Sequence, residues 1–190
     1  MLEKRFFVLL LVVSILSGLS QASILNGDFS AVDGDGNPTL EPWMHNDYVS
    51  NEGGYAFFRE NYEGDKTSWL TQMITIPDGA QLSFDYKLIS ELDTGGPPSS
   101  DTFYAYLGGI EMFSINNDSL VPAGGIISGT VLTDVSSFAG QTVELRFSLF
   151  NDDSAYITTV ELRNVDVESV PEPVTFVLLG LGAVALRRKK

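Results

Sequence analysis

Apolar and polar residues alternate with a period of two along several stretches of this chain, and this pattern limits the fold more than any other feature. Apolar side chains occupy every second position in residues 82–88 and 143–149, and Thr158, Val160 and Leu162 alternate with more polar residues. Successive side chains of a β-strand point to opposite faces, so each stretch indicates a strand with one buried face and one polar face. Between residues 23 and 168 no stretch shows the sustained apolar repeat of an amphipathic helix. The pattern therefore predicts an all-β fold.

Turn-forming residues divide the middle of the chain into segments of strand length. Clusters of Gly, Pro, Asn and Asp occur at 77–79, 95–98, 108–109, 116–118 and 151–153. Further strands are expected between such clusters, at 55–59, 68–76, 101–107, 110–115 and 125–132. Short strands with one polar face form antiparallel sheets that pack through their apolar faces. We predict one antiparallel β-sandwich of about eight strands, a jelly roll, spanning residues 23–169.

Two local irregularities are expected within this sandwich. The alternation changes parity around Asn164, because the apolar positions shift from 160 and 162 to 165 and 167. Such a shift predicts a β-bulge or bend. Residues 136–140 are expected to form a single helical turn before the strand that begins near residue 143.

The charge of the chain excludes several classes of function. Residues 23–169 contain five bases against 23 acids, a formal net charge of −18. A domain this acidic repels phosphate, so nucleic-acid binding is excluded. The chain has no cysteine, which removes disulfides, thiol nucleophiles and Cys-ligated metals. Its one histidine, His45, excludes a multi-histidine metal site.

Residues 1–22 have the composition of a secretory signal peptide. Lys4 and Arg5 provide a basic start, residues 6–19 are almost wholly apolar, and residues 20–22 have the small-x-small pattern of a cleavage site. An uncleaved membrane anchor is the alternative, but the apolar segment is short against the ~20 residues of a membrane-spanning helix. We predict cleavage after Ala22 and export.

The last 21 residues, 170–190, contain three features in order. Pro171, Glu172 and Pro173 form a stiff connector, because each proline fixes φ. Residues 174–186 carry no charge, and the chain ends in a basic tail of Arg187, Arg188, Lys189 and Lys190. Basic residues hold the adjacent end of an apolar helix on the cytoplasmic side. This short helix either spans the membrane with snorkelling and local thinning, or holds the chain transiently for a processing enzyme.

This tail resembles the PEP-CTERM sorting signal of Gram-negative bacteria. The resemblance implies that exosortase, an integral-membrane protease, recognises the Pro-Glu-Pro region and releases or transfers the protein. It also implies transient anchoring in the membrane, delivery to the cell surface or extracellular matrix, and association with cells that produce exopolysaccharide. An ordinary C-terminal anchor with a proline connector is the alternative.

The sandwich region resembles galactose-binding-like domains and carbohydrate-binding modules. Residues 25–29 are similar to the Asn-Gly-(Asp/Ser)-Phe opening of such domains, and residues 68–77 are similar to one of their strands. Trp43 falls where these domains often place a tryptophan after a variable loop. The likeness covers most of the mature chain as a pattern of strands, and it implies a fold more than a ligand.

Aromatic residues are the candidates for ligand binding. The C–H faces of sugars stack on aromatic rings while polar side chains bind the hydroxyl groups. The candidate residues are Trp43, Trp69, Tyr104 and Tyr106. The two tyrosines share one face of their expected strand. Packing in the core or an interface is the alternative for each residue.

Oxygen-bearing side chains point to two places for a structural calcium ion. Residues 33–37 space oxygen ligands at alternate positions, as calcium loops do, but they lack the helices and final acidic ligand of an EF-hand. The alternative there is an exposed acidic turn. The second candidate combines Asn26 and Asp28 with Asp166 or Glu168, where the two ends of a sandwich can meet. Related modules often hold calcium at this place, and strand capping by Asx turns is the alternative.

No residue pattern indicates catalysis. The G-x-S-x-G motif is absent, and the many acids make chance pairs at glycosidase spacing unavoidable. We predict that the protein is not an enzyme. The hypothesis is an exported, exosortase-sorted surface or matrix protein that binds a neutral glycan, such as exopolysaccharide, or organises the matrix. The alternatives are a structural or adhesive protein without a sugar site and an extracellular glycoside-active enzyme.

Overall fold

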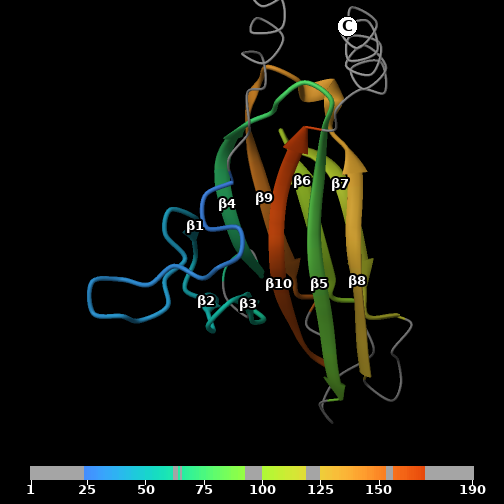
Figure 1. Ribbon diagram of the computed structural model, residues 1–190. Coiled ribbons are helices and arrows are strands. Elements are labelled where there is room, and N and C mark those ends of the chain that lie inside the picture. The colour runs from blue at the N-terminus through green and yellow to red at the C-terminus, as the bar shows by residue number, and fades with distance from the viewer. Residues whose placement is uncertain are drawn as a thin grey trace, which may run out of the picture.

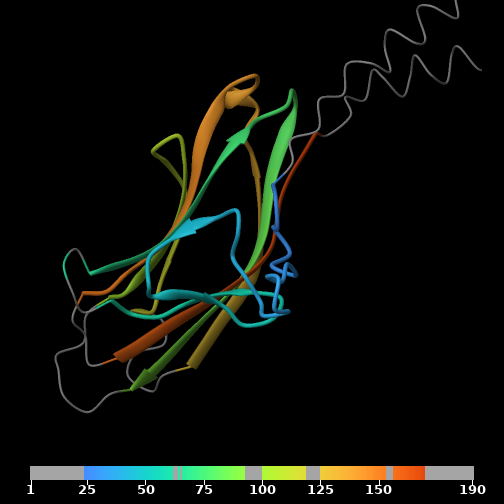
Figure 2. The ribbon, with the colours of Figure 1, turned by 90° about the vertical axis from the view of Figure 1, so that its left-hand side faces the viewer.

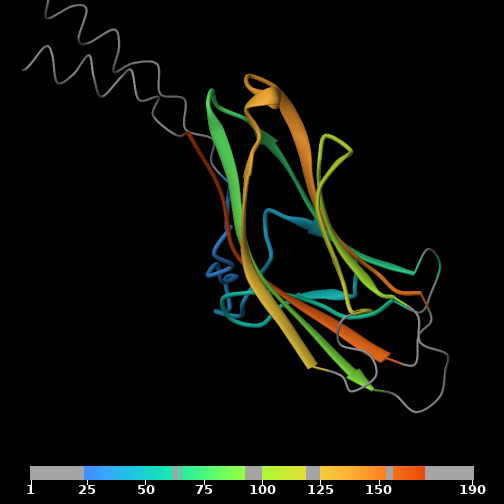
Figure 3. The ribbon, with the colours of Figure 1, turned by 90° about the vertical axis from the view of Figure 1, so that its right-hand side faces the viewer.

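The computed structural model is a sandwich of two antiparallel sheets (Figure 1). It describes residues 24–61, 64, 66–92, 100–118, 125–152 and 156–169. The first sheet contains, in spatial order, β1 (Met44–His45), β4 (Thr67–Thr75), β9 (Thr142–Phe150), β6 (Thr102–Leu107) and β7 (Ile110–Asn116). The second contains β2 (Val49–Asn51), β3 (Ala56–Phe58), β10 (Tyr156–Ser169), β5 (Ala80–Leu92) and β8 (Gly125–Asp134). Figures 2 and 3 show the two layers edge-on.

The predicted all-β sandwich is confirmed, with ten strands in the described residues rather than eight. The two additional strands, β1 and β2, are two and three residues long, too short for an alternating pattern to reveal them. The irregularity near Asn164 is also confirmed. The register of β10 against β5 shifts between Arg163 and Asp166, and Asn164 has φ of 51°. The expected helical turn is the 3₁₀-helix η2 (Ser136–Phe138).

The core between the sheets is centred on Phe147 of β9. Its ring centroid lies 5.1 Å from that of Phe84 on β5 and 6.2 Å from that of Phe103 on β6. The first contact is edge-on and the second is stacked. Trp43 also packs on Phe147, with ring centroids 6.2 Å apart. Because these buried rings come from both sheets, their contacts join the two layers.

A buried polar network joins strands of both sheets near one end of the sandwich. Thr158 Oγ1 on β10 donates to Asp101 Oδ2 at 2.6 Å, and Asn117 Nδ2 donates to Thr158 Oγ1 at 3.2 Å. The backbone N–H of Asp152 donates to Asp101 Oδ1 at 3.0 Å, and that of Thr158 donates to Glu60. Hydrogen bonds from several segments to one buried carboxylate hold those segments in a fixed relation.

Candidate functional site

The outer face of the first sheet carries aromatic and polar side chains on three adjacent strands, β4, β9 and β6. The alternating residues of β6 are buried, so Tyr104 and Tyr106 lie on the outer face. The strand register pairs Trp69 on β4 with Ser148 on β9, and Ser148 with Tyr104 on β6. The neighbouring row pairs Arg146 on β9 with Tyr106. Two rows of side chains therefore run across the strands.

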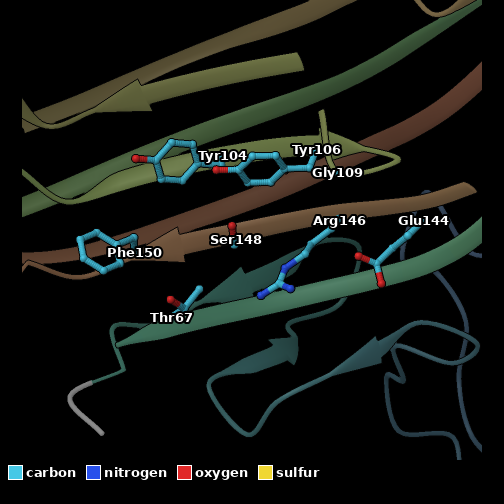
Figure 4. A pocket seen from close by; sticks show the side chains of 8 residues that line it. All are labelled: Thr67, Tyr104, Tyr106, Gly109, Glu144, Arg146, Ser148 and Phe150. Carbon is cyan, nitrogen blue, oxygen red and sulfur yellow. The ribbon is translucent and has the colours of Figure 1, made fainter. Parts of the chain in front are cut away.

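An open depression of about 550 Å³ lies on this face (Figure 4). It is lined by Thr67, Tyr104, Tyr106, Gly109, Glu144, Arg146, Ser148 and Phe150. Figure 4 shows the two tyrosine rings on one strand, facing the polar side chains of the strand beside it. We refer to these eight residues as the depression.

The two tyrosine rings form one aromatic platform. The ring centroids of Tyr104 and Tyr106 are 5.5 Å apart, with 25° between the ring planes. Partial burial, with smaller contributions from Tyr104 and Glu111, raises the pKa of the Tyr106 hydroxyl, and nearby Arg146 opposes this shift. The hydroxyl of Tyr106 therefore stays neutral at physiological pH and can both donate and accept a hydrogen bond.

Charged groups in the depression are few. Arg146 is its single base, and the Arg146 guanidinium carbon lies 5.9 Å from the Trp69 ring centroid, within reach of a cation–π contact. Glu144 is the single acid among the described residues that line the depression. Glycosidases use a pair of carboxylates, and this lining contains one. The depression offers ring faces together with a few hydrogen-bonding groups.

Three of the four predicted ligand-binding residues lie on this face. Tyr104 and Tyr106 line the depression, and Trp69, which is partly exposed, borders it through its pairing with Ser148. The sequence did not predict which polar residues lie beside these rings. Arg146 and Ser148 belong to the polar face of the alternating stretch 143–149, which is the signal that places both on the outer side of the sheet, where Ser148 is 4% exposed.

Trp43, the fourth predicted ligand-binding residue, belongs to the core instead. Its side chain is 3% exposed and packs against Phe29 and Phe147. Its indole Nε1 donates to the carbonyl oxygen of Asn26 at 3.2 Å. Because neighbouring rings cover the indole, we correct the assignment of Trp43 from ligand binding to core packing.

The side chains predicted to bind calcium are held by neighbouring groups of the protein. Asn26 Nδ2 donates to the carbonyl oxygens of Thr39 and Glu41, and its Oδ1 accepts from the backbone N–H of Ala31. Asp28 accepts hydrogen bonds from the backbone N–H and the hydroxyl of Ser30, which lower its pKa. The bond from the backbone N–H of Ser30 to Asp28 is that of an Asx turn, the alternative stated above, whereas Asn26 joins segments farther along the chain.

The third predicted calcium ligand, Asp166, accepts a hydrogen bond from the backbone N–H of Val167. Residues 33–37 form a similar closed turn, in which Asp33 Oδ1 accepts from the backbone N–H groups of Asp35 and Asn37. The described residues contain no group of three or more His, Cys, Asp or Glu side chains that could hold a metal ion. The hydrogen bonds of Asn26, Asp28 and Asp166 engage oxygen atoms that a calcium ion would need, and the calcium site at these residues stays a prediction.

The predicted signal peptide (1–22) and the predicted tail features (170–190) lie outside the described residues. These include Pro171, Glu172 and Pro173, and the basic residues Arg187, Arg188, Lys189 and Lys190. Within the described ranges, no helix is long and apolar enough to cross a membrane.

Comparison with known protein families identifies the tail. Residues 169–190 match the PEP-CTERM protein-sorting motif. The chain carries a PEP-CTERM sorting signal. The resemblance predicted from the Pro-Glu-Pro connector and basic end is therefore confirmed. A PEP-CTERM motif implies a secreted protein that is held transiently at the membrane and processed at its C-terminus. The match begins at Ser169, the last residue of β10.

The sandwich is distantly similar to several solved structures. No curated protein matches the chain. Among solved structures, a non-crystalline cellulose specific carbohydrate-binding module, CBM28, is 14% identical, with a TM-score of 0.48 over 78% of this chain and 96% of its own. TmCBM61, solved with β-1,4-galactotriose, is 13% identical, with a TM-score of 0.46 over 80% of this chain and 100% of its own. A cyclase from Fischerella sp. TAU is 11% identical, with a TM-score of 0.41 over 79% of this chain and 100% of its own. Likenesses this distant carry no argument about function.

Proposed function

We propose that this protein is a non-catalytic surface or matrix protein, processed by an exosortase-type protease, whose sandwich binds a neutral glycan on the outer face of the first sheet. The observation that carries the glycan-binding part is the platform of Tyr104 and Tyr106 beside the polar groups of the depression. A sugar residue presents apolar C–H faces to such rings and hydroxyl groups to their polar neighbours. Arg146 and Ser148 are in place to bind those hydroxyls.

A second aromatic pair provides a contrast on the opposite side of the sandwich. Tyr55 and Phe57 lie 6.3 Å apart between centroids, but edge-on, at 84°. The guanidinium carbon of Arg163 lies 4.5 Å from the Tyr55 ring centroid, and that of Arg59 lies 5.7 Å from the Phe57 centroid. Cations already stack on both of these rings. Among the described residues, no such cation lies over Tyr104 or Tyr106, so the platform is the better site for a sugar.

The charge of the domain favours a neutral polymer over an anionic one. Five bases against 23 acids in residues 23–169 leave few positions where a sulfated or uronate-rich chain could bind. Long-range repulsion slows the approach of such a chain unless salt screens it. A neutral glycan experiences no such repulsion. Single stacking sites bind weakly, so function rests on many copies at one surface.

The test is affinity electrophoresis of the full chain, in mild detergent, through gels that contain a neutral β-glucan, a galactan or an alginate. We expect a neutral gel to retard the wild type. The double variant Y104A/Y106A should lose about 30-fold in affinity, because each of its two rings contributes roughly 1 kcal/mol. The variant Y55A/F57A is the matched control and should bind like the wild type.

Three outcomes would contradict the proposal. Equal retardation of Y104A/Y106A and the wild type would place binding elsewhere. Tight binding to alginate without added divalent cations would contradict the preference for neutral chains. Absence of binding to any glycan would favour the purely structural or adhesive role.

A further inference from the structure

We propose that β8 is an interaction edge, at which two copies of this chain pair antiparallel so that their second sheets join into one continuous sheet. Strand β8 stands at the end of the second sheet and pairs with β5 along one side (Figure 1). In the described part of the chain no strand pairs with its other side. The backbone N–H and C=O groups along a free edge form a template for another strand.

The other sheet edges are each interrupted, and β8 is not. Strands β1 and β2 have two and three residues. Strand β7 carries Glu111, and its register with β6 is irregular between Ala105 and Tyr106. Strand β8 has ten residues in unbroken register with β5, and it contains neither proline nor any charge before Asp134. Proteins normally protect long edges with charges, prolines or bulges, so an edge without them is suited to pairing.

The sequence of β8 is compatible with antiparallel pairing to itself. If the two-fold axis passes through Gly129, Ile126 faces Leu132 of the second copy and Ser128 faces Thr130 of the second copy. Apolar residues then oppose apolar residues, and hydroxyl groups oppose hydroxyl groups. Directly opposed side chains in antiparallel strands are in contact distance and stabilise the pair. Ile126 and Leu132 are 59% and 65% exposed, so pairing would cover two large apolar side chains per chain.

Side chains beside this edge leave it close to neutral. The acids Asp85 and Glu161 are balanced by the bases Lys87 and Arg163, which each lie 2.8 Å from Glu161, and Arg163 also acts on Asp85. The net charge of −18 in residues 23–169 still repels a second copy at long range. Salt screens this repulsion, so association should strengthen as ionic strength rises. One strand pair buries less than the roughly 1,200 Å² of a stable interface, which suits weak pairing among crowded copies.

The test is sedimentation velocity of the full chain in mild detergent at low and high salt. We expect the average mass of the wild type to rise from one chain toward two as the salt and protein concentrations rise. The variant I126E/L132E should stay monomeric at every salt concentration, because the proposed antiparallel register would bring carboxylates of the two copies face to face. The variant I126K/L132E is the matched control and should still associate, because the same register places opposite charges face to face.

Both positions are exposed, so the circular dichroism and melting temperature of the variants should equal those of the wild type. All three proteins share the same tail, so association through the tail would not distinguish them. A wild type that stays single at every salt concentration would overturn the proposal, as would equal masses for the wild type and I126E/L132E. Dissociation of I126K/L132E would overturn the antiparallel register, and wild-type assemblies beyond two chains would overturn the closed two-fold pair.

Discussion

A Cβ atom added to Gly27 would lie 2.0 Å from the carbonyl oxygen of Val165. The backbone N–H of Val165 also donates to the carbonyl oxygen of Gly27 at 2.9 Å. The beginning of the described chain therefore lies directly on its last strand, β10, in a contact that has no room for a side chain.

We expect Gly27→Ala to lower the free energy of unfolding by about 1–3 kcal/mol, because the methyl group must push the backbone of β10 away. Gly34→Ala is the control, since a Cβ there meets nothing within 4 Å. Its effect should stay within about 0.5 kcal/mol. Urea denaturation measures both, and equal midpoints for the two variants would contradict the close packing.

Asp85 should make the fold sensitive to acid. Hydrogen bonds from Thr130 Oγ1 at 2.5 Å and Asn164 Nδ2 at 2.6 Å lower the pKa of Asp85, with a smaller contribution from Arg163. The unfolded chain therefore binds the proton more tightly than the folded one. The resulting stability is present above the unfolded pKa of about 3.9 and is lost as pH falls through the folded pKa.

We expect Asp85→Asn to be less stable than the wild type by about 1 kcal/mol at pH 7, and to approach it at low pH. Other carboxylates with lowered pKa values also contribute to acid unfolding, so the informative quantity is the difference between the variant and the wild type. Thermal melts across an acid pH series measure it. A difference that does not change with pH would show that Asp85 stabilises the fold independently of its charge.

The two tryptophans should respond differently to substitution. Trp43→Ala should cost about 3–5 kcal/mol of stability, because it leaves a cavity beside Phe29 and Phe147. Trp69→Ala, on the partly exposed outer face, should cost less than about 1 kcal/mol of stability. It should weaken glycan binding less than Y104A/Y106A does, because Arg146 already contacts the Trp69 ring. Denaturation and affinity electrophoresis of both variants separate the two roles. Normal stability for Trp43→Ala would contradict its place in the core.

Calcium should not stabilise the sandwich, because Asn26 and Asp28 are committed to hydrogen bonds within the protein. We expect a chelator to leave the melting temperature unchanged. Some stabilisation by any divalent ion can follow from the net charge of −18 in residues 23–169. A saturable increase with Ca²⁺ that Mg²⁺ does not reproduce, and that is lost in Asp28→Ala, would instead restore the calcium site predicted from the sequence.

Deletion of residues 171–190 should release the sandwich from the membrane while leaving export intact, because the deletion removes the sorting motif and spares residues 1–22. Fractionation of producing cells measures the location of the protein. Mass spectrometry of the full-length protein should show a C-terminus shortened within or near the motif. Intact protein that still ends in Lys190 in cells with a working exosortase would contradict processing.

Local alternation was sufficient to predict the long strands and the shared face of Tyr104 and Tyr106, since a strand repeats every two residues. It was insufficient for Trp43, which precedes the two-residue strand β1 and has no flanking pattern to set its orientation. The proximity of Arg146 to Tyr106 could not be predicted either. It depends on which strands are neighbours and on their register, and both are set by the topology of the whole sandwich.

The position of β10 has a mechanical consequence. This strand ends where the sorting motif begins, and it is a central strand with β3 on one side and β5 on the other. Its ladder with β5 runs from Tyr156 to Ser169, with one interruption. Hydrogen bonds between antiparallel strands lie across the strand direction, so tension along β10 loads many of them at once in shear. While the tail is attached, a force that pulls on it is therefore resisted by the whole β10–β5 ladder.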